Sequence, residues 1–166
     1  TPLTTLALGE LIAEHTDIPP GVVNILSSSR AETGEVLTTH PDVDLVTFTG
    51  ATTTGRAIMA AAADTVKRVF LELGGKSAMI VLDDADYTKA AMFAAFTICS
   101  HSGQGCALTS RLLVPRADHD RIVQLVAAGM ERVRVGNPKA PETAMGPLIS
   151  EQQRDKVDAM VRRAVE

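Results

Sequence analysis

Short β-branched runs that alternate with helical segments are the feature that most limits what this chain can fold into. The runs lie at 22–26, 45–48 and 68–73, and the helical segments at 3–15, 31–39 and about 56–64. Strands separated by helices of this length form βαβ units, which build a parallel sheet with helices on its faces. The pattern predicts an α/β fold.

A second section begins after Gly74 and Gly75, which end the third run. The expected elements of this section are a strand at 77–82, a helix at about 88–100, a strand at 112–114, a helix at 118–133 and a helix at 150–166. Ser150 and Gln153 have the spacing of a capping box at the start of the last helix. We place a domain boundary at 73–76, with one domain at 1–73 and the next at 74–166.

Charge balance and cysteine content exclude several classes of function. Sixteen basic side chains and twenty acidic ones give a net charge of −4, which argues against a nucleic-acid or anionic-membrane surface. No apolar run approaches the roughly 20 residues that span a bilayer. Two cysteines are too few for a disulfide scaffold, so we expect a reducing, cytoplasmic setting.

Cys106 follows a glycine-rich loop at 102–105. Glycines let the backbone approach a ligand closely and free N–H groups to face a developing anion. A thiol there is a candidate nucleophile, and the alternative is a small buried apolar residue, as most free cysteines are. Cys99 lies inside the apolar helix, and we interpret it as a core residue.

Glu72 closes the apolar strand at 68–73, directly before the two glycines. A carboxylate in such a place is costly unless it faces a cleft or has a partner. Desolvation would make it a better general base. The alternative is a solvated carboxylate at the end of a strand.

A threonine- and glycine-rich segment, 49–55, joins a strand to a helix. A helix N-terminus offers unpaired N–H groups and a positive dipole end, which suit a pyrophosphate. The spacing of Gly50 and Gly55 is not the dinucleotide-binding fingerprint, so a plain βα turn explains the segment equally well. The histidines show no metal-ligand spacing, and we expect no metal site.

Several motifs, in this order and spacing, resemble the aldehyde dehydrogenase superfamily. They are Pro-Gly-Val-Val-Asn at 20–24, Phe-Thr-Gly at 48–50 with Gly55, Glu-Leu-Gly-Gly-Lys at 72–76, Gly-Gln-Gly-Cys at 103–106, Gly-Asn-Pro at 136–138 and Met-Gly-Pro-Leu at 145–148. The resemblance covers essentially all 166 residues, and Glu72 and Cys106 lie 34 positions apart. Three ordered central motifs at fixed spacing make this a specific likeness.

The resemblance implies part of a doubly wound, parallel-sheet nucleotide-binding domain at 1–73, followed by part of the α/β catalytic domain at 74–166. It implies that Cys106 attacks an aldehyde to form a thiohemiacetal, which passes hydride to NAD or NADP. Glu72 would then activate water to hydrolyse the thioester to a carboxylate, since members that pass the acyl group to coenzyme A resemble this chain less at Glu72. The expected cofactor-binding residues are Thr49, Gly50, Ala51, Gly55 and Leu73.

The resemblance also predicts that the chain is a central fragment. The family's oxyanion Asn and adenosine-ribose Lys lie upstream of this segment, and its nicotinamide-ribose Glu and oligomerisation strands lie downstream. The chain also begins without methionine, and the helix at 150–166 has no terminating residue. We expect the parent to be a dimer or tetramer. The alternative is an inactive truncated chain that only binds nucleotide or partner chains.

Two departures concern the cofactor. Ala51 stands where many members have Ser, which removes one hydroxyl near the pyrophosphate. The stretch Ser-Ser-Ser-Arg at 27–30 replaces a glycine-containing stretch beside the adenosine site. Arg30 could favour a ribose phosphate, so NAD and NADP both stay open.

Overall fold

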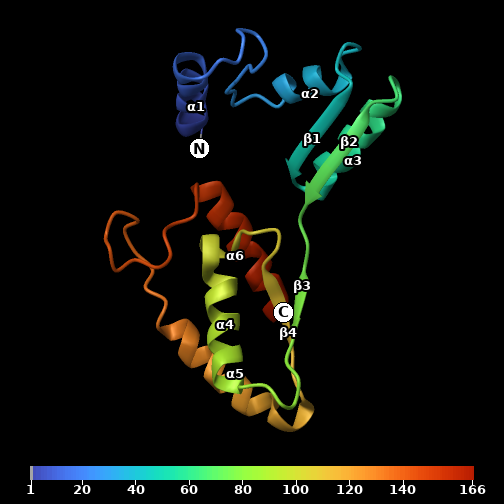
Figure 1. The fold of residues 1–166 in the computed structure, drawn as a ribbon. Coiled ribbons are helices and arrows are strands. Elements are labelled where there is room, and N and C mark those ends of the chain that lie inside the picture. The colour runs from blue at the N-terminus through green and yellow to red at the C-terminus, as the bar shows by residue number, and fades with distance from the viewer. Residues whose placement is uncertain (1) are drawn as a thin grey trace. The chain divides into compact units, whose positions relative to one another are not determined.

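Two strand–helix–strand arrangements organise the chain (Figure 1). The computed structural model describes residues 2–166, which divide into two units, one ending at Leu71 and the other covering Glu72–Glu166. The strands β1 (Leu45–Gly50) and β2 (Arg68–Leu73) are neighbours in one sheet, and α3 (Thr52–Ala63) connects them. The strands β3 (Ser77–Ile80) and β4 (Thr109–Leu113) pair in parallel, joined through α4 (Tyr87–Cys99). The expected α/β class is confirmed.

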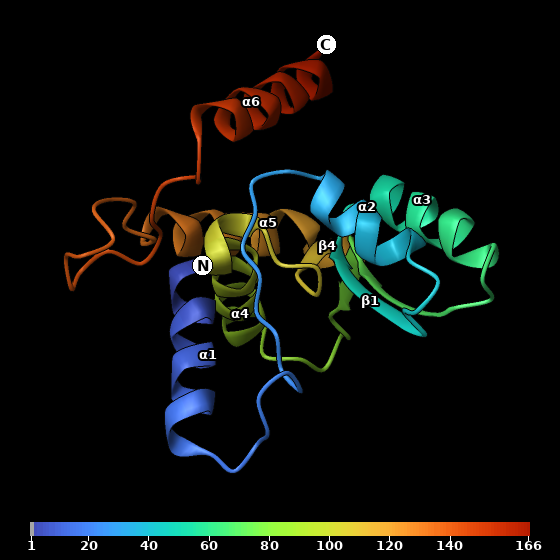
Figure 2. The ribbon, with the colours of Figure 1, turned by 90° about the horizontal axis from the view of Figure 1, so that it is seen from above.

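The first unit also contains α1 (Pro2–His15) and α2 (Glu32–Thr39). α2 packs against α3, as Figure 2 shows. Ile58 and Ala62 of α3 are buried there, together with Thr38 and Lys67. The Lys67 ammonium donates a hydrogen bond to the carbonyl of His40, so this buried charge has a polar partner.

The predicted strand at 22–26 is wrong. These residues form neither a helix nor a strand, and Val22 and Leu26 are 66% and 73% exposed. A strand needs a neighbour for its N–H and C=O groups, and the sheet of the first unit consists of β1 and β2. The β-branched residues at 22–26 therefore have no neighbouring strand with which to form backbone hydrogen bonds.

The predicted start of the next helix, at about residue 56, is also wrong. β1 continues to Gly50, Ala51 is the N-cap with extended backbone (φ −70°, ψ 141°), and α3 begins at Thr52. Gly55 already donates its N–H to the Ala51 carbonyl at 3.0 Å. Glycine and threonine cost little in a first turn, where most N–H groups have no helical partner, so the helix starts four residues earlier than 56.

In the second unit, α4 packs against α5 (His119–Glu131). A Cβ on Gly129 would lie 3.0 Å from the Ala95 Cβ, so glycine lets the two helices approach closely. The core here consists of Val81, Ala91, Ala94, Ala95 and Ile122.

The boundaries of three elements follow from specific bonds. Asp86 begins α4, because its side chain accepts the N–H groups of Thr88 and Lys89. Ser150 Oγ accepts the Gln153 N–H at 3.2 Å, so the predicted cap of α6 (Glu151–Val165) is confirmed. β4 begins three residues before the predicted strand at 112–114, because Thr109 already pairs with Ser77 of β3.

Two short turns complete the second unit, η1 (Ser100–Gly103) and the 3₁₀ turn η2 (Arg116–Asp118). Within residues 2–166, no helix is both long and apolar enough to cross a membrane. Many large apolar side chains are exposed, among them Phe70 at 60%, Ile80 at 68% and Phe96 at 71%.

Candidate functional site

Cys106 lies in the short connection between η1 and β4, and its side chain is exposed. Its thiol and its backbone N–H make no hydrogen bond to any residue that the structure describes. The turn around it is tight: Leu108 donates its N–H to the Gly105 carbonyl at 3.4 Å, and a Cβ on Gly105 would lie 2.9 Å from the Leu108 side chain. The predicted nucleophile is therefore accessible, with a free N–H donor beside it.

The chain enters this turn through three consecutive residues with left-handed backbone. The φ angles are 50° at His101, 56° at Ser102 and 74° at Gly103. Only glycine adopts this region without steric cost, so His101 and Ser102 are strained. Residues in such conformations persist only where their surroundings hold them.

One long-range hydrogen bond reaches this strained segment. Ser102 Oγ donates to the Gly146 carbonyl at 3.2 Å, across 44 positions of sequence, and the contact is partly buried. Ser102 is therefore a further residue of interest beyond the predicted site residues. No local pattern could have indicated this bond, because its acceptor is a backbone oxygen in a distant loop.

Glu72 lies at the end of β2, and its side chain is exposed. It has no hydrogen-bond or ion-pair partner within residues 2–166. The residues after it approach the cysteine: a Cβ on Gly75 would lie 3.6 Å from the Cys106 carbonyl oxygen. The structure thus brings the segment after Glu72 against the backbone of Cys106. Of the two interpretations of Glu72, the structure agrees with a solvated carboxylate at the end of a strand.

The predicted cofactor residues of the first unit gather at the junction of β1 and α3. Thr49 and Gly50 end the strand and Ala51 caps the helix without a side-chain acceptor. No acidic residue occupies the first turn of α3, and the N–H groups of residues 52–54 find no acceptor among the described residues. Unpaired donors at a positive helix end fit an anionic phosphate group.

Two other predicted cofactor residues have clear packing roles. Gly50 accommodates the Phe48 ring, which a Cβ at position 50 would overlap, and Gly55 is buried within α3. Leu73 belongs to the second unit and is half-buried at the end of β2. Among the predicted cofactor residues, the unpaired backbone N–H donors lie at Ala51 and in the first turn of α3 that follows it.

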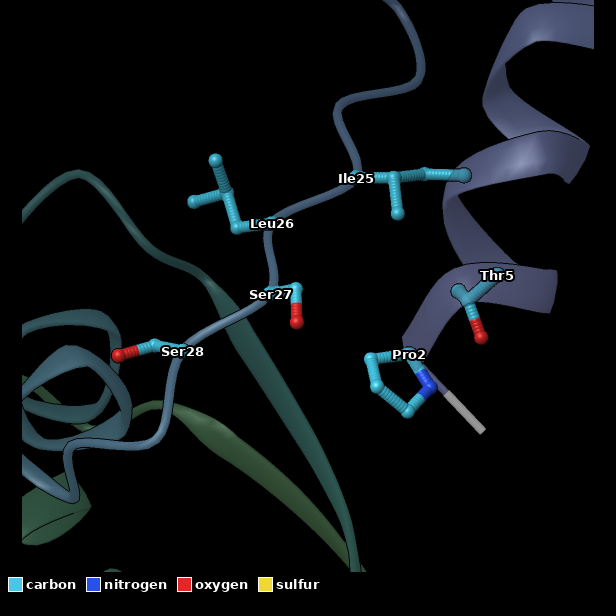
Figure 3. A pocket seen from close by; sticks show the side chains of 6 residues that line it. All are labelled: Pro2, Thr5, Ile25, Leu26, Ser27 and Ser28. Atoms are coloured by element: carbon cyan, nitrogen blue, oxygen red, sulfur yellow. The ribbon is translucent and has the colours of Figure 1, made fainter.

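A shallow hollow in the first unit lies beside the serine-rich stretch (Figure 3). Its volume is about 270 Å³, and it is lined by Pro2, Thr5, Ile25, Leu26, Ser27 and Ser28. Ser28 Oγ is engaged locally, since it accepts the Arg30 N–H at 3.0 Å and the Thr33 hydroxyl at 2.9 Å. The Arg30 side chain is exposed and forms no ion pair within the described part of the chain.

Cys99 and the residue types that bind metals are the remaining candidates. Cys99, interpreted as a core residue, is only half-buried at the end of α4. Phe96, three residues earlier in the same helix, is itself 71% exposed. Residues 2–166 contain no group of three or more His, Cys, Asp or Glu side chains that could hold a metal ion.

Comparisons with known proteins give one consistent result. The model of the aldehyde dehydrogenase family matches residues 1–166. The 2-hydroxymuconic semialdehyde dehydrogenase of Pseudomonas sp. (strain CF600) is 44% identical over 167 residues, which cover 100% of this chain and 34% of that protein. Betaine aldehyde dehydrogenase of Bacillus subtilis is 42% identical over 166 residues, with the same two shares.

Solved structures agree with these relatives. A mutant of aldehyde dehydrogenase C from Pseudomonas syringae, in complex with NAD+ and octanal, has a TM-score of 0.94 at 35% identity and matches 99% of this chain. The Mycobacterium tuberculosis aldehyde dehydrogenase complexed with NAD+ has a TM-score of 0.94 at 41% identity, again over 99% of this chain. Each match covers 34% of the solved chain. The chain spans about a third of the length of the curated relatives it matches.

Proposed function

The chain belongs to the aldehyde dehydrogenase family, and on that premise we propose that it is the central part of an oxidoreductase that converts an aldehyde to a carboxylate with NAD or NADP. Relatives named as dehydrogenases of a semialdehyde and of betaine aldehyde support this reaction class. The observation that carries the proposal is the accessible thiol of Cys106, with an unpaired N–H beside it and the segment after Glu72 against its backbone.

Cys106 is the nucleophile in this proposal. Its thiolate attacks the aldehyde carbon and forms a thiohemiacetal, and the former carbonyl oxygen becomes an oxyanion. The free N–H of Cys106 is placed to donate to that oxygen, which is the usual way in which backbone groups stabilise such a charge. The thiol can attack without first breaking a hydrogen bond to another side chain, because it has no partner within residues 2–166.

The turn that begins α3 is the part of this chain that fits the cofactor. Thr49, Gly50, Ala51 and Gly55 shape a helix N-terminus with free N–H groups and no acidic side chain, and Leu73 follows at the end of β2. When bound, NAD(P) supplies the two-electron oxidant for the step from thiohemiacetal to thioester. Relatives solved with NAD+ favour NAD. The unpaired Arg30 leaves NADP as the alternative.

Glu72 completes the cycle as a general base. It accepts a proton from water while the water oxygen attacks the thioester carbon. The C–S bond then breaks, Glu72 gives its proton to the departing Cys106 thiolate, and the acid product leaves as a carboxylate after losing a proton to solvent. An exposed and unpaired carboxylate is free for this task. Its presence favours hydrolysis over transfer of the acyl group to coenzyme A.

The wider organisation belongs to the same proposal. Residues 1–73 are assigned to the nucleotide-binding domain and 74–166 to the catalytic domain, in a parent that forms a dimer or tetramer. The two free cysteines fit a reducing, cytoplasmic setting. A second candidate function, a truncated chain that only binds nucleotide or partner chains, is favoured by the extent of exposed apolar surface.

The test separates the two steps of the reaction in the full-length protein. Glu72→Gln should keep a pre-steady-state burst of NAD(P)H with one equivalent per site, because thioester formation does not need the activated water. Steady-state turnover should fall by about 10²–10⁴-fold, the usual contribution of a general base. Stopped-flow absorbance of NAD(P)H measures both quantities.

Two further variants are the controls. Cys106→Ser should abolish the burst and turnover together, and Glu131→Gln, at the exposed end of α5, should change neither. Loss of the burst in Glu72→Gln would show that Glu72 acts before hydrolysis. A wild-type protein with no aldehyde-dependent NAD(P)H formation would favour the non-catalytic alternative.

A further inference from the structure

The turn that carries Cys106 depends on a contact outside itself. His101 and Ser102 both have left-handed backbone at φ 50° and 56°, a region that costs free energy for residues with a Cβ. Two such residues in succession do not hold their conformation through local preference. Some contact of the surrounding structure must keep them there.

The Gly146 carbonyl accepts a long-range hydrogen bond from this segment. Ser102 Oγ donates to it at 3.2 Å in a partly buried position. The acceptor belongs to a loop that is itself braced: Gly136 donates its N–H to the Met145 carbonyl at 3.1 Å, and Met145 donates to the Arg134 carbonyl at 3.1 Å. A hydroxyl bonded to a fixed oxygen restrains the backbone that carries it.

The restraint is transmitted to the cysteine over a short path. Gln104 donates its N–H to the His101 carbonyl at 3.2 Å, so the segment from His101 to Gln104 is one closed turn. Gly105 follows, packed under the Leu108 side chain with no room for a Cβ. A displacement of Ser102 would therefore also displace the N–H of Cys106, because these contacts hold the residues between them.

We propose that Ser102 is a positioning residue: its hydrogen bond to the Gly146 carbonyl holds the left-handed turn that aims the N–H and thiol of Cys106 at the aldehyde. This role rests on the proposed function for its catalytic part. The anchoring part concerns the chain's own geometry and can be measured without activity. Ser102 acts through Cys106 and does not contact the substrate.

The first measurement detects loss of the Ser102–Gly146 hydrogen bond in the full-length protein. In Ser102→Ala, hydrogen–deuterium exchange should become faster in peptides that cover 100–108 and 143–148, because the bond that joins them is lost. Exchange in α5 should not change. Ser102→Asn keeps a hydrogen-bond donor and tolerates left-handed backbone, so it should retain slow exchange in both segments.

The second measurement follows the chemistry. Ser102→Ala should lower the rate constant of the NAD(P)H burst about tenfold or more, with little change in the KM for aldehyde or in the melting temperature. A displacement of about 1 Å at a reacting group can cost ~100-fold. Ser102→Asn should restore most of the rate, because its amide can donate to the same carbonyl; loss of packing alone would not predict this for a larger side chain.

Ser100→Ala is the matched control. Ser100 Oγ donates to the Phe96 carbonyl at 2.9 Å, within the last turn of α4, so the same side chain is removed two residues away without loss of a long-range bond. It should leave the burst rate unchanged. A Ser102→Ala variant with wild-type exchange and wild-type burst would overturn the proposal.

The outcomes separate this inference from the proposed function. A wild-type protein without dehydrogenase activity, in which Ser102→Ala still speeds exchange, would overturn the proposed function and leave Ser102 as an anchor of the turn. An active wild type in which Ser102→Ala speeds exchange but leaves the burst unchanged would overturn the positioning role alone.

Discussion

At the scale of single residues, the two cysteines differ in their surroundings. Cys99 ends a helix and is half-buried, whereas Cys106 is exposed in a turn with a free N–H. Thiolate chemistry requires access and nearby donors. The structure provides both at Cys106, so the two thiols should react at different rates.

Selective alkylation tests this difference. In folded protein, Cys106 should react with iodoacetamide faster than Cys99, by about tenfold or more, because only its thiol is both accessible and beside a free donor. Brief treatment followed by peptide mapping measures the two rates, and unfolded protein supplies the reference in which they are equal. Preferential labelling of Cys99 would remove the basis for Cys106 as the nucleophile.

At the scale of elements, the N-cap determines where α4 begins. Asp86 accepts the N–H groups of Lys89 and Thr88 at 3.1 Å each. The hydrogen bond from the Lys89 N–H is the largest cause that holds the pKa of Asp86 below its usual value of 3.8, and the nearby ammonium of Lys89 acts in the same direction. An ionised cap therefore stabilises the start of the helix that leads to the Cys106 turn.

The stability of this cap should depend on pH with a definite sign. Because the folded pKa lies below the unfolded one, the stabilisation is present above about pH 4 and is lost as the pH falls through the folded value. Asp86→Ala should lower the melting temperature by about 2–4 °C at pH 7. The difference from wild type should shrink as the pH falls below 4.

Thermal melting by circular dichroism between pH 7 and pH 3 measures this effect. Asp84→Ala, at an exposed position two residues before the cap, should show neither the loss nor its pH dependence. A loss that stays constant over this range would mean that the carboxylate charge contributes nothing to the cap.

At the scale of the whole molecule, the described residues bury few large side chains. Ile122 is the largest fully buried one in residues 2–166, and many Leu, Ile, Val, Phe and Met side chains are exposed. Large exposed apolar area marks a surface that associates with other surfaces. We therefore expect the isolated chain to dissolve poorly or to form oligomers.

The isolated 166-residue chain should also have no dehydrogenase activity. It contains Cys106 and Glu72 but lacks the oxyanion Asn and the ribose-binding side chains that the family resemblance requires, and loss of one oxyanion donor costs ~10²–10³ in rate. Purified chain incubated with NAD, NADP and a panel of aliphatic and aromatic aldehydes tests this. Saturable cofactor reduction that Cys106→Ser abolishes would show that the site is complete in this chain.

The local elements could be predicted well from the sequence, and the exceptions are informative. β2 begins and ends at the predicted residues 68 and 73, and α6 begins after the predicted Ser150 cap. Propensity and capping act over a few neighbouring residues, so they are visible in sequence. The run at 22–26 has the same propensity but no strand, because its pairing depends on a neighbour elsewhere in the chain.

The order and spacing of the motifs around Glu72 and Cys106 already indicate the family, so the sequence alone makes these two residues candidates for the chemistry. The contacts that hold them become visible in the fold: Gly75 lies against the Cys106 carbonyl, and the Gly146 carbonyl accepts a hydrogen bond from the Ser102 hydroxyl. These contacts join segments that are far apart along the chain, and one partner in each is a backbone oxygen, which every residue has. A pattern of side chains in the sequence therefore cannot indicate these contacts, which form only when the chain folds.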